Sequence, residues 1–162
     1  MFDFAPTAPA GKAALYADLL HAADAVTQGE EDAVAHMANI AAILWQFLPD
    51  LNWAGFYRLV NGELVLGPFQ GKPACIRIPL GRGVCGVAAA TRETQLVADV
   101  HAFPGHIACD AASASEIVVP LLLHAGRLVG VLDLDSPSQG RFDIEDARGL
   151  EALAILIAER IG

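Results

Sequence analysis

Apolar residues recur every three or four positions in two segments near the start of the chain. In residues 12–27 the apolar positions that follow this spacing are Leu15, Leu19, Ala22, Ala23 and Val26. A second stripe, from Val34 to Leu48, follows three acidic residues that favour a helix start and precedes Pro49. This spacing is typical of amphipathic helices. We therefore expect two helices before any strand, preceded by an N-terminal arm over residues 1–10.

The middle of the chain has the composition of β-strands. Residues 53–60 are rich in aromatic and β-branched side chains, and Asn61-Gly62 is a strong hairpin signal that predicts a return strand over 63–66. Beyond it we expect, in chain order, a loop over 67–73, a strand over 75–79, a short helix over 84–91, a strand over 95–98 and an irregular loop over 101–115. A loop as long as the last one is usually functional or disordered in a compact domain.

The most regular hairpin pairs residues 116–123 with residues 128–135. Whether its connection has two or four residues, opposite positions sum to 251, so that Glu116 faces Asp135. Side chains two positions apart share a face of a strand, which adds Asp133 to this face. Like charges opposite each other destabilise a sheet, and pooled carboxylates raise at least one pKa. The alternatives are that the acids are solvated edge residues, or that a bulge breaks the register.

A final helix capped by Asp143 follows a turn-rich loop over residues 136–141. The element order predicts an α+β fold in which helices from both ends of the chain flank an antiparallel sheet. A length of 162 residues favours one domain, which we assign to residues 11–162 because no linker or repeat is visible. Met37 and Trp45, on the second helix, are expected in the core or at the surface of a homodimer.

The composition argues against several classes of partner. With 54% apolar and 18% charged residues, the chain has the composition of a well-packed protein. A net charge of −9 without a basic stripe argues against binding to nucleic acid or to an anionic membrane. No apolar run is long enough to span a bilayer and no export signal is visible, so we expect a cytoplasmic protein. His36 and His124 are expected in solvent.

Three cysteines without a CxxC motif argue against disulfide staples and against structural zinc, and we expect no bound metal. Cys75 and Cys85 have apolar neighbours, as small buried hydrophobes do. Cys109 instead lies in the long loop, between His106 and Asp110. A thiol beside carboxylic acids suits an electrophile that is protonated as it is attacked. The residues by themselves leave a thiol enzyme and a redox switch open.

Six segments of the chain resemble the free methionine-(R)-sulfoxide reductases, a family built on a single GAF domain. They are residues 52–57, 67–75, 83–86, 103–110, 115–120 and 132–136. The resemblance covers roughly residues 12–160 and includes all three cysteines and all three acids. It implies a GAF-like fold and a thiol-dependent oxidoreductase that needs no cofactor.

The same resemblance assigns roles to the cysteines. Cys109 would be the nucleophile, whose thiolate attacks the sulfoxide sulfur of free L-methionine-(R)-sulfoxide and becomes a sulfenic acid. Cys75 would be the resolving thiol that forms a disulfide with it, and thioredoxin would reduce that disulfide. Cys85 would correspond to the third cysteine of the family, as an alternative resolving thiol or a relay.

The resemblance also implies a binding site for a free amino acid. The three acids of the last hairpin would bind the substrate ammonium and polarise or protonate the sulfoxide oxygen. Trp53 and Tyr57 share one strand face and would form the wall that holds the methyl group. The backbone N–H groups of Ile107, Ala108 and Cys109 would receive the substrate carboxylate.

Two functions of other classes compete with this one. A non-catalytic GAF sensor for a small ligand such as a cyclic nucleotide is disfavoured by the carboxylates, which would repel a phosphate. A thiol redox sensor would signal by forming a disulfide. The absence of an output domain within 162 residues weighs against both.

Overall fold

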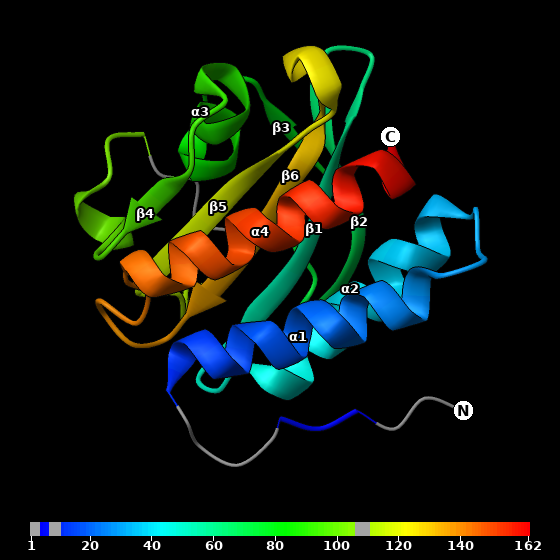
Figure 1. Ribbon diagram of the computed structural model, residues 1–162. Coiled ribbons are helices and arrows are strands. Elements are labelled where there is room, and N and C mark those ends of the chain that lie inside the picture. The colour runs from blue at the N-terminus through cyan, green and yellow to red at the C-terminus, as the bar shows by residue number, and fades with distance from the viewer. Residues whose placement is uncertain (1–3, 7–10, 106–110) are drawn as a thin grey trace.

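The computed structural model describes residues 4–6, 11–105 and 111–162. Within these residues six strands form one antiparallel sheet in the order β3-β2-β1-β6-β5-β4 (Figure 1). The strands are β1 (Trp53–Val60), β2 (Glu63–Gly71), β3 (Arg77–Pro79), β4 (Gln95–Val97), β5 (Ser115–Leu122) and β6 (Leu128–Ser136). The helices are α1 (Lys12–Thr27), α2 (Ala33–Phe47), α3 (Gly83–Thr91) and α4 (Ile144–Ile161), with 3-10 turns η1 (Val100–Ala102) and η2 (His124–Gly126). The predicted α+β arrangement is confirmed.

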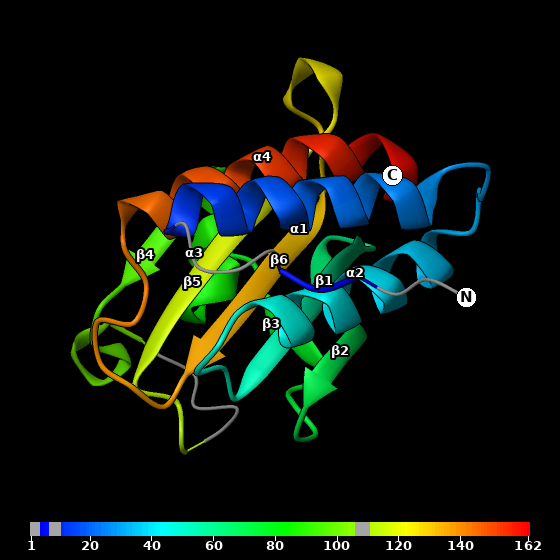
Figure 2. The ribbon, with the colours of Figure 1, turned by 60° about the horizontal axis from the view of Figure 1, so that its bottom comes forward.

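The helices form unequal layers on the two faces of the sheet. On one face α2 and α4 contact the strands, and α1 runs alongside α4 (Figures 1 and 2). On the other face α3 packs against β5 and β6. Neighbouring residues of β1 enter opposite cores, because side chains alternate along a strand: Phe56 lies in the core under α2 and α4, and Tyr57 lies in the core under α3.

A partly buried ionic cluster of Lys12, Asp143 and Asp146 joins the first helix to the last. Asp146 is 1% exposed, and it accepts hydrogen bonds from the Tyr16 hydroxyl at 2.8 Å and from the Lys12 ammonium at 2.6 Å. Lys12 also pairs with Asp143 at 2.7 Å and lowers the pKa of that carboxyl to about 2. Asp143 caps α4, as predicted, by accepting from the backbone N–H groups of its first turn. The cluster therefore fixes α1 on the start of α4.

Two strand boundaries differ from those predicted by more than one residue. β2 continues through residues 67–71, which were expected to form a loop. The extension is possible because Gly55, opposite Phe69, has no side chain: a Cβ there would lie 2.3 Å from the Phe69 Cβ. The third strand begins at Arg77 and not at Cys75. The longer β2 brings Phe69 to the face of the sheet that α3 covers.

The structure shows whether two histidines and two apolar residues of the second helix lie where they were predicted. His36 is 2% exposed, so its expected place in solvent was wrong; its Nε2 lies 3.2 Å from the carbonyl oxygen of Glu30. It lies one helical turn from Ile40, on the face of α2 that enters the core. The His124 side chain is 94% exposed, as predicted. Met37 is buried in the core, whereas Trp45 is 41% exposed.

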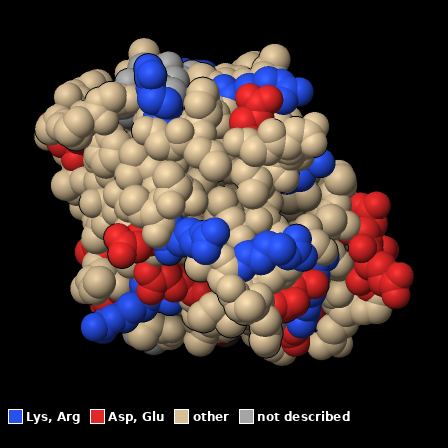
Figure 3. Space-filling view, turned by 90° about the horizontal axis from the view of Figure 1, so that it is seen from above, with Lys and Arg blue, Asp and Glu red and all other residues tan. Residues whose placement is uncertain are grey.

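The surface carries charges of both signs. On the face seen in Figure 3, Lys and Arg side chains lie near Asp and Glu side chains around an uncharged central area. An ion pair between Arg160 and Asp24, at 2.6 Å, links α4 to α1. Among the described helices, none has the length and apolar character that a bilayer crossing requires.

Candidate active site

The three acids of the last hairpin lie together on the α3 side of the sheet, and we call β5 and β6 with these acids the acid hairpin. β5 and β6 pair Glu116 with Asp135 and Val118 with Asp133, which confirms the predicted register. Beyond Leu121 the register shifts, so that Leu122 and not Leu123 pairs with Leu128; the predicted sum of 251 was wrong there, away from the acids. Glu116 and Asp133 are 6% and 5% exposed, and Asp135 is half-buried. They are therefore not solvated edge residues.

Burial and mutual repulsion dominate the electrostatics of this cluster. Desolvation raises the pKa of Glu116 well above its usual value, and the negative charges of Asp133 and Asp135 raise it further. Desolvation and Asp135 likewise raise the pKa of Asp133, against hydrogen bonds from Cys85 and Glu116 that lower it. A hydrogen bond between Glu116 and Asp133 lets the two carboxyl groups share one proton. Such a pair can retain a proton near neutral pH, as a general acid must.

Cys85 contacts the same acids from α3, the helix that covers this face of the sheet. It lies in the first turn of α3 and is 3% exposed, and its Sγ lies 4.0 Å from Glu116 Oε1. Desolvation raises the pKa of this thiol well above its usual value, and the charges of Asp133 and Glu116 raise it further. The thiol therefore keeps its proton. Its burial was predicted from its apolar neighbours, but its contact with the acids was not.

An aromatic stack formed by Trp53, Tyr57 and Phe69 stands beside the acid hairpin. The Trp53 ring centroid lies 5.8 Å from that of Tyr57 and 5.2 Å from that of Phe69. The two β1 rings meet because Gly55, between them, has no side chain, and β6 places Asp133 opposite Gly55 and Asp135 opposite Trp53. Aromatic faces and carboxylates thus line one continuous area of the sheet.

Phe69 was not predicted to be a site residue. Its segment was expected to be a loop, so its side chain could not be assigned to a face of the sheet. The available signal was Gly55, because a glycine in the interior of a strand often marks a close approach by another backbone.

The aromatic stack also holds the segment that carries Cys75. The Trp53 indole N–H donates to the Lys72 carbonyl at 3.2 Å, and the Tyr57 hydroxyl donates to the Cys75 carbonyl at 3.0 Å. Cys75 is half-buried and disulfide-bonded, in contrast to Cys85, which is a free thiol. The expectation that Cys75 is simply a buried hydrophobe was therefore wrong. Trp53 and Tyr57 keep its backbone next to the acid hairpin.

The remaining predicted site residues lie outside the described part of the chain. These are Cys109, the predicted nucleophile, and Ile107 and Ala108, whose N–H groups were expected to bind a carboxylate. The described chain ends at Gly105 on one side of them and resumes at Ala111 on the other. Their roles stay predictions from the sequence.

The chemistry of the donor atoms favours a hydrogen-bonding cation over a metal ion. Atoms of Cys85, Glu116 and Asp133 lie within 4.8 Å of one another, close enough to surround one cation. Asp133 Oδ1 is buried without a hydrogen-bond partner among the described residues, so it can accept a bond from a bound group. A metal would require Cys85 as a thiolate, which burial opposes. An ammonium group requires only carboxylates.

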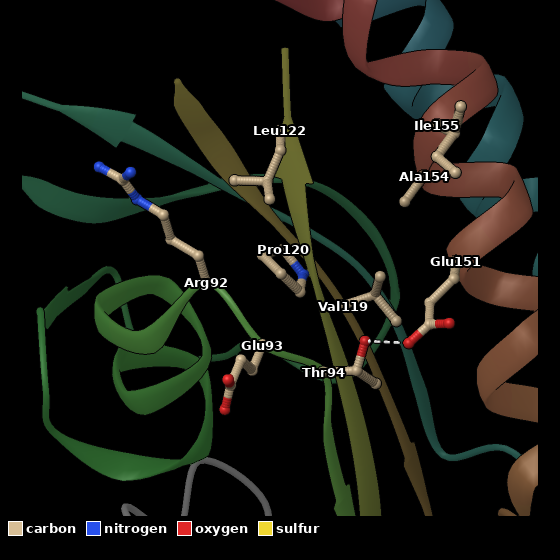
Figure 4. Close-up of a pocket in the computed structure, with 9 residues that line it drawn as sticks. All are labelled: Arg92, Glu93, Thr94, Val119, Pro120, Leu122, Glu151, Ala154 and Ile155. Atoms are coloured by element: carbon tan, nitrogen blue, oxygen red, sulfur yellow. Dashed lines mark hydrogen bonds between the residues drawn. The ribbon is translucent and has the colours of Figure 1, made fainter. Parts of the chain in front are cut away.

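A separate groove of about 480 Å³ lies between α4 and the edge of the sheet formed by β4 and β5 (Figure 4). A hydrogen bond of 2.6 Å from the Thr94 hydroxyl to Glu151 crosses it. Its walls include Val119, Pro120 and the exposed Ile155. None of the predicted site residues that the structure describes contributes to its lining.

Comparison with known proteins agrees with this geometry. A family model described as a GAF domain matches residues 23–161. The free methionine-R-sulfoxide reductase of Escherichia coli is 55% identical over 142 residues, which cover 88% of this chain and 86% of that protein. The enzyme of the same name from Saccharomyces cerevisiae is 45% identical over 146 residues, which cover 86% of this chain and 81% of that protein. The X-ray structure of free methionine-R-sulfoxide reductase from Neisseria meningitidis in complex with its substrate is 47% identical, with a TM-score of 0.94 over 99% of this chain and 96% of that one. This chain therefore has the GAF fold and belongs to the free methionine-R-sulfoxide reductase family.

Proposed function

We propose that this protein reduces free L-methionine-(R)-sulfoxide to methionine at the acid hairpin. The observation that carries the proposal is the buried pair of Glu116 and Asp133, which can hold a proton beside Asp133 Oδ1, an oxygen with no hydrogen-bond partner in the described part of the chain. The reaction needs both features, because the sulfoxide oxygen takes up a proton and a free amino acid brings an ammonium group. Membership in the family supports the same activity.

The ammonium group, the sulfoxide oxygen and the methyl group of a free methionine sulfoxide each have a complementary group on this face of the sheet. The ionised acids would bind the ammonium group, and the protonated member of the pair would donate to the sulfoxide oxygen. The aromatic stack offers an apolar wall for the methyl group. The N–H groups of residues 107–109 are the predicted site for the substrate carboxylate. Methionine sulfoxide within a peptide has neither free terminal group, so we expect it to be a poor substrate.

The proposed reaction uses two thiols and no further cofactor. The Cys109 thiolate attacks the sulfoxide sulfur, the sulfur–oxygen bond breaks, and the oxygen passes with a proton to Cys109 as a sulfenic acid. Methionine sulfur gains two electrons and Cys109 loses two. The Cys75 thiol then displaces water from the sulfenic acid to form a disulfide, and the dithiol of thioredoxin reduces it by exchange.

The test of this function is a thioredoxin-coupled assay that follows NADPH consumption. The substrates are free L-methionine-(R)-sulfoxide, its S epimer and a peptide that contains methionine sulfoxide. We expect consumption with the free R form only. Consumption with none of the three would contradict the proposed function and favour a GAF sensor.

Replacing Cys75 with serine is expected to allow one turnover and then stop the reaction. Cys75 is the described cysteine that is disulfide-bonded, which supports its assignment as the resolving thiol. The measurement is the amount of methionine formed per chain with excess substrate, thioredoxin, thioredoxin reductase and NADPH. We expect about one equivalent from Cys75→Ser, in contrast to continued turnover by Cys85→Ser. Sustained turnover by Cys75→Ser would show that another group resolves the sulfenic acid.

We infer further that residues 11–162 act as one catalytic domain. The two hydrophobic cores contain residues from elements distributed along the chain. The ionic cluster of Lys12, Asp143 and Asp146 joins α1 to α4. The exposed Trp45 side chain is compatible with the homodimer suggested by the sequence. Homodimerisation and a cytoplasmic location stay predictions.

A further inference from the structure

Cys85 is a thiol that the proposed reaction does not use, yet it is buried against the groups that perform it. Its residue is 3% exposed, and its Sγ lies 4.0 Å from Glu116 Oε1. It also makes a hydrogen bond with Asp133. A thiol is a weak donor, whereas carboxylate oxygens are acceptors, so the S–H group points its proton toward the acid pair.

The position of Cys85 is set by the tight packing of the first turn of α3. Gly86 follows it, and a Cβ on Gly86 would lie 2.4 Å from the carbonyl oxygen of Pro79. The Gly86 carbonyl accepts a 2.7 Å bond from the N–H of Gly81, and its own N–H donates to the Arg82 carbonyl at 3.1 Å. These contacts in the turn between β3 and α3 therefore fix the N-terminal end of α3 against the sheet, where Cys85 contacts the acids.

This buried environment makes the Cys85 thiol unreactive in thiol–disulfide exchange. Thiol–disulfide exchange requires a thiolate. A helix N-terminus favours the thiolate, but full burial and two neighbouring carboxyl groups oppose it more strongly. Of the two cysteines that the structure describes, the half-buried Cys75 is in a disulfide and Cys85 is not.

We propose that Cys85 is a positioning residue, whose thiol donates to the Glu116–Asp133 pair and fixes where that pair holds its proton, and that it carries no electrons during turnover. This assignment rests on the proposed function of the acid hairpin. It removes the choice between an alternative resolving thiol and a relay that the sequence left open.

The expected effect on the pair has a definite sign. Among the residues that the structure describes, the titratable groups that face Asp133 besides Cys85 of α3 are Glu116 on β5, Asp135 on β6 and Tyr57 on β1. A hydrogen bond donated to a carboxylate favours its ionised form. Removal of the donor should therefore leave the pair protonated to higher pH.

Two variants of nearly equal size test the hydrogen bond directly. Cys85→Ser retains a donor and Cys85→Ala removes it, while both leave a similar small void. Infrared spectroscopy of the reduced, substrate-free protein follows the carbonyl stretch of the protonated carboxyl groups across pH. The midpoint in Cys85→Ala is expected at higher pH than in Cys85→Ser, by roughly half a pH unit. Equal midpoints in the two variants would overturn the positioning role.

The kinetic readout connects this shift to the reaction. The pH profile of kcat/KM should move to higher pH in Cys85→Ala relative to Cys85→Ser. A general loss of packing would lower both profiles without displacing one from the other, and that result would also overturn the role. A wild-type protein inactive on all three substrates, with the infrared shift present, would contradict the proposed function and leave the hydrogen bond established.

The claim that Cys85 carries no electrons has its own test. The wild-type protein is exposed to one equivalent of substrate without reductant, denatured in acid and alkylated, and its peptides are analysed by mass spectrometry. Cys85 is expected to be alkylated in full, with the disulfide elsewhere. Recovery of Cys85 in a disulfide in a substantial fraction of chains would overturn the claim.

Discussion

Replacing Cys109 with serine is expected to lower kcat/KM for free L-methionine-(R)-sulfoxide by at least about a thousandfold. A serine hydroxyl in the same place stays protonated and is a far weaker nucleophile toward sulfur than a thiolate. The acid hairpin and the aromatic stack would still bind the substrate, because their residues are unchanged. We therefore expect kcat to fall while substrate affinity is largely retained.

The measurement is single-turnover formation of methionine, combined with calorimetric titration of the substrate into the reduced variant. Dithiothreitol replaces thioredoxin, so that a failure of disulfide exchange cannot be mistaken for a failure of attack. Cys75→Ser serves as the matched thiol-to-hydroxyl control and should form methionine in the first turnover. Methionine formation by Cys109→Ser at more than a tenth of the wild-type rate would exclude Cys109 as the nucleophile.

Replacing Asp133 with asparagine is expected to reduce kcat/KM by roughly 10²–10³-fold and to stabilise the fold at neutral pH. The activity falls because the variant cannot share a proton with Glu116 or offer a carboxylate to the substrate. The stability rises because an ionisable group with few partners leaves the interior, where it lies opposite Gly55 and beside two other acids. Active-site groups often carry such a cost in stability.

The pH dependence of this stabilisation follows from the direction of the pKa shift. Burial raises the pKa of Asp133 above the value of about 3.9 that applies in the unfolded chain. Between the two values the folded protein holds more protons, so the wild-type free energy of unfolding falls as pH rises above about 4. The amide of the Asp133→Asn variant does not titrate, so the advantage of this variant should be largest at pH 7–8, at about 1–3 kcal/mol, and smallest below pH 4.

Thermal unfolding of both proteins between pH 3.5 and pH 8 checks this expectation. Each kcal/mol should raise Tm by roughly 2–4 °C in a chain of this size. Glu93→Gln is the matched control, since it removes one negative charge from an exposed position. An Asp133→Asn variant that is less stable than the wild type at pH 8 would contradict the account of the acid pair.

The sequence alone was sufficient to predict the structure where the local pattern of apolar residues agrees with their burial in the fold. The two N-terminal helices and the pairing of Glu116 with Asp135 were predicted from periodicity, the Asp143 cap was predicted from its residue type, and all were confirmed. Register could be predicted because a slip by one residue would move every apolar side chain of the hairpin to the wrong face. The family was also visible in the cysteine motifs, and the comparisons confirm it.

Other features depended on contacts between segments far apart in the chain. Phe69 joins the aromatic stack only because Gly55, in another strand, admits the extended β2. His36 is buried because α2 turns it toward the core, although its residue type favours solvent.

The sequence by itself predicted which residues would carry the chemistry, and it determined which strand faces the described ones share, because alternation along a strand is a local property. The tertiary structure decided which of those residues are buried, and with which partners. Cys85 of α3 contacts Glu116 of β5, a residue thirty-one positions further along the chain. Desolvation depends on everything packed around a group, so the proton that the acid pair can hold follows from the folded arrangement.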